Sequence, residues 1–249
     1  MTTNYLTYVL IVAATASRLV AQEAAPLWSY QGAKGPDHWG DLKPEYRTCK
    51  AGMEQSPIDI RNPALQSLPV LAFDYSAVPL KIIDNGHSIQ VNYSPGSFMT
   101  VAGARYELRQ FHFHHPSEER IKGKSYPMAV HLVHADKDGK LAVVAIPLEK
   151  GPPNKTIQDI WTRLPKVKDV EQEAGAIAIN AADLLPKQTG YFTYSGSLTT
   201  PPCTEGVTWF VLKTPVAISQ GQIDIFSKLY PDNARPIQPT RGREVRASQ

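Results

Sequence analysis

Alternation of apolar and polar residues dominates the middle of the chain, and this period of two predicts β-strands. We expect strands at Leu80–Ile83, Ser88–Tyr93, Phe98–Val101, Arg105–His114, Met128–His134, Leu141–Leu148, Tyr191–Ser195 and Val207–Lys213. The first two flank Asp84-Asn85-Gly86, a turn sequence typical of β-hairpins. Helical spacing predicts helices at Thr156–Leu164 and at Ser219–Tyr230, where Ser219 can cap the helix.

The segments between these elements predict turns and loops. Trp28–Trp39 is rich in Gly and aromatic residues and is expected to be coil. Gln55–Ile60 is expected to be a short extended element, in which Pro57 suits a sheet edge or a cis bond. Gly196–Pro202 is polar and conformationally stiff, so we expect a loop held in one shape.

Composition agrees with a β-rich fold that has many turns. The chain has 249 residues, of which 42% are apolar, with 21 Pro and 16 Gly. This length suits one domain, or at most two small ones. The net charge is only +3, and no aromatic residues interleave with the late arginines Arg241, Arg243 and Arg246. We therefore expect a solvated tail there and no nucleic-acid partner.

The N-terminus has the pattern of an export signal. Tyr5–Ala16 is apolar but too short to span a bilayer. Ala14-Thr15-Ala16 fits a small-x-small cleavage site, and Leu19-Val20-Ala21 is a poorer second choice. No Lys or Arg precedes the apolar stretch, which departs from the usual pattern. We predict a signal peptide over residues 1–21, cleaved after Ala16 or Ala21, and a secreted or periplasmic protein without a stable membrane anchor.

The two cysteines, Cys49 and Cys203, suit an exported protein with one disulfide. A bridge between them would close a loop of more than 100 residues. The chain-entropy model values such a bridge at about 5 kcal/mol. The alternative is a pair of buried free thiols.

Five of the seven histidines fall within Leu108–His134. Residues i and i+2 of a strand share a face, so His112 and His114 project together while Phe111 and Phe113 point the other way into apolar packing. A hairpin-like return of the strand at 128–134 would bring His131 beside this pair. Three neutral imidazoles around one point are what a catalytic Zn²⁺ needs if its fourth position is to stay open.

These histidines also admit other interpretations. His115 and His134 face away from the ligand candidates by parity, so both are expected to be structural. H-x-H followed by Glu118 also resembles the cupin pattern, in which Glu and a later His complete an iron or manganese site. The glycines of that pattern are misplaced here, since Gly103 lies too far upstream and Gly123 too near.

A series of ordered motifs gives the chain a family resemblance. The motifs are Trp28-Ser29-Tyr30, Gly35-Pro36-Asp37-His38-Trp39, Gln55-Ser56-Pro57-Ile58-Asp59, Asn85-Gly86-His87, Gln110–His114, Pro116-Ser117-Glu118, His131-Leu132-Val133-His134 and Ser197–Pro202. Together they resemble the alpha-class carbonic anhydrases, over a domain spanning residues 26–246. The resemblance implies a mainly β (α+β) single domain, built on a large twisted, mostly antiparallel central sheet with short peripheral helices.

The resemblance also implies a zinc enzyme that interconverts CO₂ and bicarbonate by means of zinc-bound hydroxide. His112, His114 and His131 would hold Zn²⁺. Thr199 and Glu118 would orient the hydroxide, and His87 would be the proton shuttle, since an imidazole suits proton transfer near neutral pH. The same hydroxide could hydrolyse activated esters. The resemblance implies further roles. Gln110 would contact His112. Tyr30, Asn85 and Gln90 would line a water path, and Cys49 and Cys203 would form a disulfide. The substrate pocket would be lined by Val133, Val143, Leu198, Thr200, Val207 and Trp209.

Two positions depart from the family. Ala129 stands two residues before His131, where the family usually has a Glu bonded to that ring, and Glu119 stands where it usually has His. Loss of such a carboxylate typically weakens metal affinity about 10–100-fold. We hypothesise that Glu119 supplies the missing carboxylate. The rival interpretation is a catalytically weakened binding or storage protein of the same fold, and Ala129 is the feature that favours it.

Overall fold

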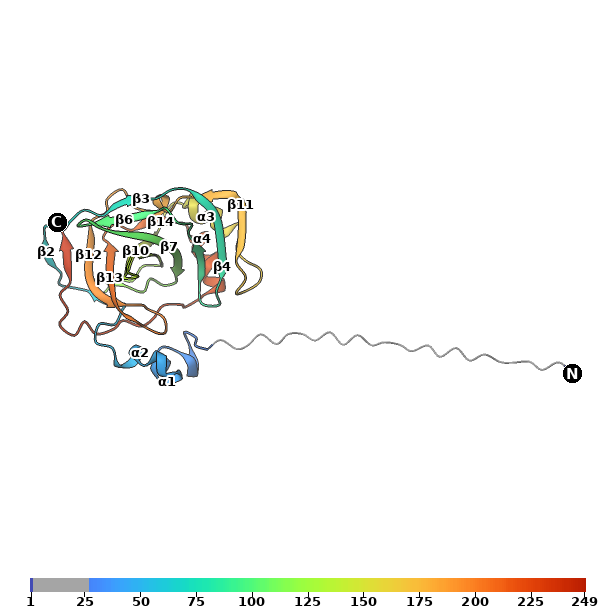
Figure 1. The fold of residues 1–249 in the computed structure, drawn as a ribbon, viewed down its shortest axis with the longest axis horizontal. Coiled ribbons are helices and arrows are strands. Elements are labelled where there is room, and N and C mark those ends of the chain that lie inside the picture. The colour runs from blue at the N-terminus through green and yellow to red at the C-terminus, as the bar shows by residue number, and fades with distance from the viewer. Residues whose placement is uncertain (2–26) are drawn as a thin grey trace.

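The fold is built on a single large sheet (Figure 1). The structure is a computed structural model, and it describes residue 1 and residues 27–249. The sheet has 13 strands. Its main path runs, in spatial order, through β11 (Gln172–Ile179), β4 (Val78–Asp84), β5 (Ile89–Asn92), β7 (Ala104–His114), β9 (Met128–Ala135), β10 (Leu141–Lys150), β13 (Glu205–Leu212), β12 (Tyr191–Ser197), β15 (Arg246–Ser248) and β2 (Ala64–Gln66). Most neighbours are antiparallel, but β10–β13 and β15–β2 are parallel. The predicted fold class is confirmed.

Smaller elements surround this path. Three strands branch from it: β3 (Ala72–Asp74), β6 (Phe98–Val101) and β14 (Val216–Ile218), and a separate parallel pair joins β1 (Asp59–Ile60) to β8 (Arg120–Ile121). The helices are α1 (Trp39–Leu42), α2 (Thr48–Ala51), α3 (Lys155–Trp161) and α4 (Gln220–Leu229), with 3₁₀ turns η1 (Gly32–Lys34), η2 (Pro44–Tyr46) and η3 (Ala181–Leu184). In Figure 1, α1 and α2 lie together beside one end of the sheet.

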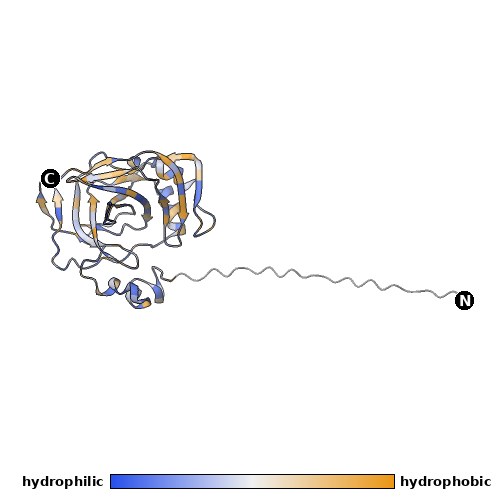
Figure 2. Cartoon of the chain, viewed as in Figure 1, coloured by the Kyte–Doolittle hydropathy of each residue, from blue (hydrophilic) through white to orange (hydrophobic). Residues whose placement is uncertain are grey.

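The central strands are buried on both faces. On β10, Val144 and Ile146 belong to the main core, whereas Val143 and Ala145 belong to a second cluster on the opposite face. This accounts for the strongly apolar colouring of several central strands (Figure 2). As predicted, Phe111 and Phe113 lie in the main core, where Phe113 packs against Trp161 of α3 at 4.7 Å between ring centroids.

Both predicted antiparallel pairings form. β4 and β5 pair on either side of Asn85–Ser88, with Asp84 opposite Ile89, and Gly86 takes a left-handed φ of +77°. β7 and β9 pair antiparallel. The return between β7 and β9 is what brings widely spaced histidines onto neighbouring strands.

Helix boundaries follow their capping residues. Ser219 and Gln222 form a capping box at the start of α4, as the Ser219 prediction requires. The other predicted helix begins one residue early, at Lys155 after the Asn154 cap, and ends at Trp161 instead of Leu164. The coil prediction for Trp28–Trp39 is wrong in part, because η1 lies inside it and α1 begins at Trp39.

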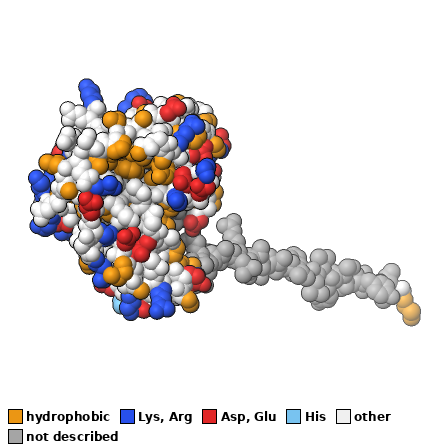
Figure 3. All heavy atoms as spheres, turned by 60° about the vertical axis from the view of Figure 1, so that its left-hand side comes forward, with side chains coloured by type: hydrophobic (Ala, Val, Ile, Leu, Met, Phe, Trp, Pro, Cys, Tyr) orange, Lys and Arg blue, Asp and Glu red, His pale blue; other side chains and the backbone are white. Residues whose placement is uncertain are grey.

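Cys49 and Cys203 form a disulfide across 154 residues, and the free-thiol alternative is therefore wrong. The Ser56–Pro57 peptide is cis, as are His115–Pro116 and Pro201–Pro202. Positive and negative side chains are interspersed over the face drawn in Figure 3, in keeping with the small net charge. Within the described residues, no helix is both long and apolar enough to cross a membrane. The predicted signal peptide lies outside the described residues.

Candidate metal centre

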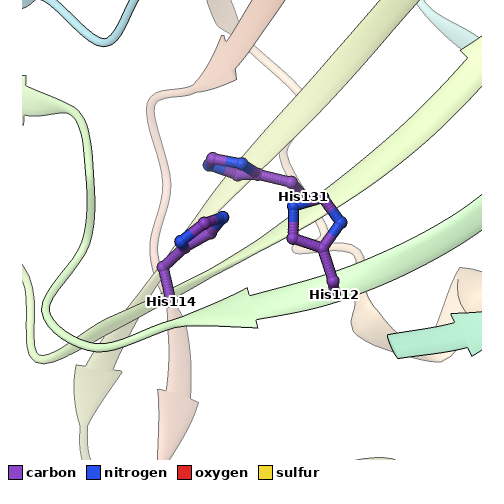
Figure 4. Close-up of side chains that lie close together, drawn as sticks. All are labelled: His112, His114 and His131. Atoms are coloured by element: carbon purple, nitrogen blue, oxygen red, sulfur yellow. The ribbon is translucent and has the colours of Figure 1, made fainter. Parts of the chain in front are cut away.

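Three histidine side chains from two adjacent strands converge on one point (Figure 4). His112 and His114 project from the same face of β7, and His131 of β9 pairs directly opposite His112. The ring centroids are 5.0 Å apart for His112–His114, 5.5 Å for His112–His131 and 4.5 Å for His114–His131. One nitrogen of each ring lies within 4.8 Å of the corresponding nitrogens of the other two. The site thus follows from strand alternation and register.

A hydrogen bond occupies the outer nitrogen of each ring. His112 Nδ1 bonds Gln110 Oε1 at 2.8 Å, as the family resemblance implies for Gln110. His114 Nδ1 bonds the backbone oxygen of Asn233 at 2.8 Å. His131 Nε2 contacts Glu119 Oε2 at 3.2 Å. The nitrogens left for a shared ligand are therefore His112 Nε2, His114 Nε2 and His131 Nδ1. His114 Nε2 is buried and lacks a hydrogen-bond partner among the described residues.

Burial keeps two of the three rings neutral. Burial lowers the pKa of His112 to about 3 and holds the pKa of His114 well below its ordinary value. Both rings are thus neutral, as ligands must be. Burial also acts to lower the pKa of His131, but attraction and hydrogen bonding by Glu119, together with Glu118, outweigh it and raise the value.

Two buried carboxyl groups, those of Glu118 and Glu119, lie beside the three histidines and would offset the charge of a bound cation. Glu118 and Glu119 are 2% and 4% exposed. Desolvation raises the pKa of Glu118 to about 7, although His131, the Arg235 backbone and the Thr199 side chain lower it in part. A dication in the centre would favour the charged form of Glu118. The donor set, the neutral rings of His112 and His114 and the two carboxyl groups fit Zn²⁺.

Glu118 is oriented by backbone donation. Its Oε1 accepts a hydrogen bond from Arg235 N–H at 2.8 Å. Its Oε2 lies 3.5 Å from His114 Nε2 and 3.8 Å from His131 Nδ1. It is not one of the three residues whose ligand atoms all converge within 4.8 Å. Thr199 is 5% exposed, and its side chain acts to lower the pKa of this carboxyl group.

The unusual pair of positions next to His131 has a structural explanation. Ala129 is buried and pairs with His114 across the β7–β9 ladder, so it brings no polar group to the site. The two oxygens of Glu119 lie 3.1 and 3.2 Å from His131 Nε2. A carboxylate from the chain after β7 thus occupies the position next to His131 that Ala129 cannot fill.

An apolar surface borders the histidines on the β10 and β13 side. Val143 pairs with Val133 across β9–β10 and with Trp209 across β10–β13. These side chains join Val207 and Leu198 in the second hydrophobic cluster. The Trp209 ring lies 5.1 Å from the His131 ring. The predicted pocket residues are therefore together, and Thr200 follows Thr199 in the loop after β12.

His87 and the predicted water-path residues lie on the β4–β5 side. The His87 ring stacks on Trp28 at 3.6 Å, and Tyr30 lies edge-on to it at 6.5 Å. Asn85 Nδ2 donates to Gln90 Oε1 at 3.3 Å, and Gln90 pairs with His112 across β5–β7. A side-chain hydrogen bond thus connects the turn that carries His87 with β5, the strand that pairs with β7.

Two residues that support the site are not predicted from the sequence. Asn233, fully buried, donates from Nδ2 to the backbone oxygens of His87 and Phe113, both at 3.0 Å. Arg235 donates to Gln55 Oε1 and to the backbone oxygens of Ser56 and Cys49, at distances of 2.8, 2.8 and 2.9 Å. Both lie in a segment without periodicity, so no sequence pattern signals their roles.

The remaining two histidines of the central stretch lie outside the centre, as parity predicts. His134 is buried, with Nε2 2.6 Å from the Tyr75 hydroxyl and Nδ1 3.3 Å from the Ala142 oxygen. His115 Nδ1 bonds the Pro231 oxygen at 2.8 Å. Both have structural partners.

Comparisons with known proteins agree with this geometry. The family model described as eukaryotic-type carbonic anhydrase matches residues 34–249. The chain is 46% identical to a carbonic anhydrase of a Nostoc species, covering 88% of this chain and 84% of that protein. It is 42% identical to a carbonic anhydrase of Neisseria gonorrhoeae, covering 96% and 95%. Among solved structures, a hyperthermostable carbonic anhydrase from a hydrothermal vent chimney superposes with a TM-score of 0.86 at 49% identity, covering 89% and 100%. The cupin alternative is wrong.

Proposed function

Because the chain belongs to the eukaryotic-type, or alpha-class, carbonic anhydrase family, we propose that it hydrates CO₂ reversibly to bicarbonate and a proton. Zn²⁺ would be held by His112 Nε2, His114 Nε2 and His131 Nδ1. The observation that carries the proposal is that each outer nitrogen is already bonded while the inner three face one point. When bound, zinc supplies a water-derived nucleophile at neutral pH, an effect for which carbonic anhydrases are the standard example.

Thr199 and Glu118 orient the attacking oxygen. If the Thr199 hydroxyl donates a hydrogen bond to Glu118, its oxygen is left only as a hydrogen-bond acceptor. It therefore selects an attacking group that can donate an O–H hydrogen bond to it. Donation from Arg235 N–H fixes the carboxylate that sets this direction. The pair thus positions the nucleophile, which is a major contribution to rate when the geometry is productive.

The apolar wall holds the substrate. CO₂ is nonpolar and gains little from polar contacts, so Val133, Val143 and Trp209 suit it better than hydrogen-bonding groups. Leu198 and Val207 extend the same surface, and Thr200 borders it. The product is charged and fits this wall less well, which favours its departure into water. Activated esters small enough for the wall are expected to be hydrolysed as a side reaction.

His87 transfers the proton that each hydration releases. Burial lowers the pKa of His87 from its ordinary value, with smaller effects of Asp169, Lys168 and Asp84. A neutral imidazole is ready to accept a proton and pass it to solvent. Tyr30, Asn85 and Gln90 would line the path, and burial keeps the pKa of Tyr30 well above its ordinary value, so its hydroxyl stays protonated.

We also propose an extracytoplasmic location. The Cys49–Cys203 disulfide supports this, because disulfides persist in oxidising compartments.

The binding-protein alternative rests on Ala129. The contact between Glu119 and His131 argues against it, since the ring keeps a carboxylate partner. Zinc content distinguishes the two functions: the enzyme would hold one zinc per chain, whereas a binding protein of this fold would hold none.

The test is stopped-flow CO₂ hydration on metal-analysed protein, with and without a chelator and a sulfonamide. We expect one zinc per chain and fast hydration that both reagents suppress. Zinc-free folded protein, or zinc-loaded protein without hydration, would contradict the proposed function. Iron or manganese in place of zinc would contradict the assigned metal.

A further inference from the structure

The turn that presents His87 is fixed by hydrogen bonds to Asn85 and to Asp84, and the proposed mechanism does not use Asp84. Asn85 Oδ1 accepts hydrogen bonds from the N–H groups of His87 and Ser88, at 3.0 and 2.8 Å. Asp84 Oδ1 accepts one from Gly86 N–H at 3.0 Å. The Asp84 carboxylate therefore fixes Gly86, which has a left-handed backbone conformation and immediately precedes His87.

Three segments of the chain meet at Asp84. The Tyr230 hydroxyl donates to the same carboxylate oxygen. The backbone oxygen of Asp84 accepts a hydrogen bond from Asp169 N–H at 2.7 Å. Asp84 and Tyr230 are both buried, at 6% and 8% exposed. Because both residues are buried, water competes little for the two hydrogen bonds that the carboxylate accepts.

Tyr230 connects the turn to a rigid part of the core. It caps the C-terminal end of α4, where its N–H donates to the Phe226 oxygen at 2.9 Å. Its ring lies 5.7 Å from the Phe226 ring, which belongs to the main core. Burial, followed by the hydrogen bond and charge of Asp84, raises the pKa of Tyr230, so the hydroxyl remains a donor.

We propose that Tyr230, acting through Asp84, is a positioning residue for His87. The pair fixes the turn, and the turn sets how far the imidazole stands from the three-histidine centre. The His87 ring also stacks on Trp28, and the backbone oxygen of His87 accepts a hydrogen bond from Asn233 Nδ2. This inference rests on the proposed function, in which His87 carries the proton to solvent.

The contacts of the metal centre do not include Tyr230. The outer nitrogens of His112, His114 and His131 are held by Gln110, Asn233 and Glu119. Loss of the Tyr230 hydroxyl should therefore slow proton export without slowing attack on CO₂. Misplacement by about 1 Å can cost up to about 100-fold in a step that depends on geometry.

The test is the variant Tyr230→Phe in zinc-loaded protein, assayed by stopped-flow at low buffer concentration. We expect kcat to fall while kcat/KM stays unchanged, because proton export follows the steps that kcat/KM reports. Imidazole added as a diffusible proton acceptor should restore kcat. Tyr191→Phe is the matched control, because the Tyr191 hydroxyl also makes a hydrogen bond, to the Pro69 oxygen at 2.6 Å. Tyr191 is on β12, five strands away from β5 in the sheet order. The control variant should leave kcat unchanged.

A second variant and a second readout separate positioning from folding. Asp84→Asn keeps an acceptor oxygen in place and should retain more of kcat than Asp84→Ala. The ring protons of His87, observed by NMR, should shift in Tyr230→Phe as stacking on Trp28 relaxes, and should not shift in Tyr191→Phe.

Unchanged kcat and unchanged His87 signals in folded Tyr230→Phe would overturn the inference. Equal losses of kcat and kcat/KM that imidazole does not restore would overturn it as well, by showing a purely structural role. Failure of the proposed function would be seen earlier and separately, as wild-type protein that does not hydrate CO₂.

Discussion

Replacing Glu119 with Gln tests whether this residue supplies the carboxylate that Ala129 lacks. The Glu119 oxygens lie 3.1 and 3.2 Å from His131 Nε2, and both residues are almost completely buried. The amide keeps the shape and one acceptor but removes the charge, so the ring becomes a weaker base and a weaker ligand. Loss of a partner of this kind weakens metal binding by about 10–100-fold. This corresponds to about 1.4–2.7 kcal/mol of binding free energy.

The assay is competition for Zn²⁺ between the folded protein and a chromophoric chelator of known affinity. Glu149→Gln is the control, because that carboxylate pairs with Lys124 at an exposed surface site, away from the centre. Its zinc affinity should equal that of the wild type. A Glu119→Gln variant that binds zinc as tightly as the wild type would refute the reasoning.

A double variant tests the same contact from the opposite strand. Ala129 is two residues before His131 on β9, so its side chain points to the same face. In the Glu119→Gln background, Ala129→Glu should restore a carboxylate to the ring and recover zinc affinity. In the wild-type background the same change adds a carboxylate beside Glu118 and Glu119, so it should lower the melting temperature. Equal effects in the two backgrounds would show that the positions are independent.

Two further predictions concern stability. Burial lowers the pKa of His134 from 6.5 to about 4, so the folded protein favours the neutral ring. The contribution of this ring to the free energy of unfolding is complete above pH 6.5 and is lost progressively as the pH falls from 6.5 through about 4. The loss reaches about 3 kcal/mol, and His134→Leu should flatten this part of the stability profile in urea titrations at stepped pH; an unchanged profile would contradict it. Replacing Cys49 and Cys203 together with Ser opens a loop spanning 154 residues and should lower the free energy of unfolding by up to about 5 kcal/mol, measured in urea; a loss below about 1 kcal/mol would exclude a major role.

The sequence predicts the metal centre because simple rules govern its residues. Alternation on β7 separates His112 and His114 from Phe111 and Phe113, and antiparallel return places His131 opposite. The same alternation predicts the central strands to within a few residues. These strands are buried, so packing enforces the pattern that the prediction uses.

The elements that the sequence does not predict lack such a pattern. β11 has three Ala and one Gly among its eight residues, and only one of the eight is buried at this sheet edge, so the strand lacks a clear alternation of apolar and polar side chains. β2 and β15 have three residues each, too few for any period. Asn233 and Arg235 act through contacts with segments more than 100 residues away, which local sequence does not encode. The Glu119–His131 contact is predicted only by comparison with the family pattern.

Arg235 has a consequence for how the protein is made. It bonds residues that lie 117 to 186 positions earlier in the chain, among them Cys49 and Glu118. During synthesis from the N-terminus, the strands that bear the histidines leave the ribosome long before this arginine does. Until it arrives, Glu118 lacks this backbone donor and the backbone oxygen of Cys49 lacks this hydrogen bond. The site can therefore be completed only when nearly the whole chain has emerged, and truncation shortly before residue 235 should leave a sheet-forming chain without a finished centre.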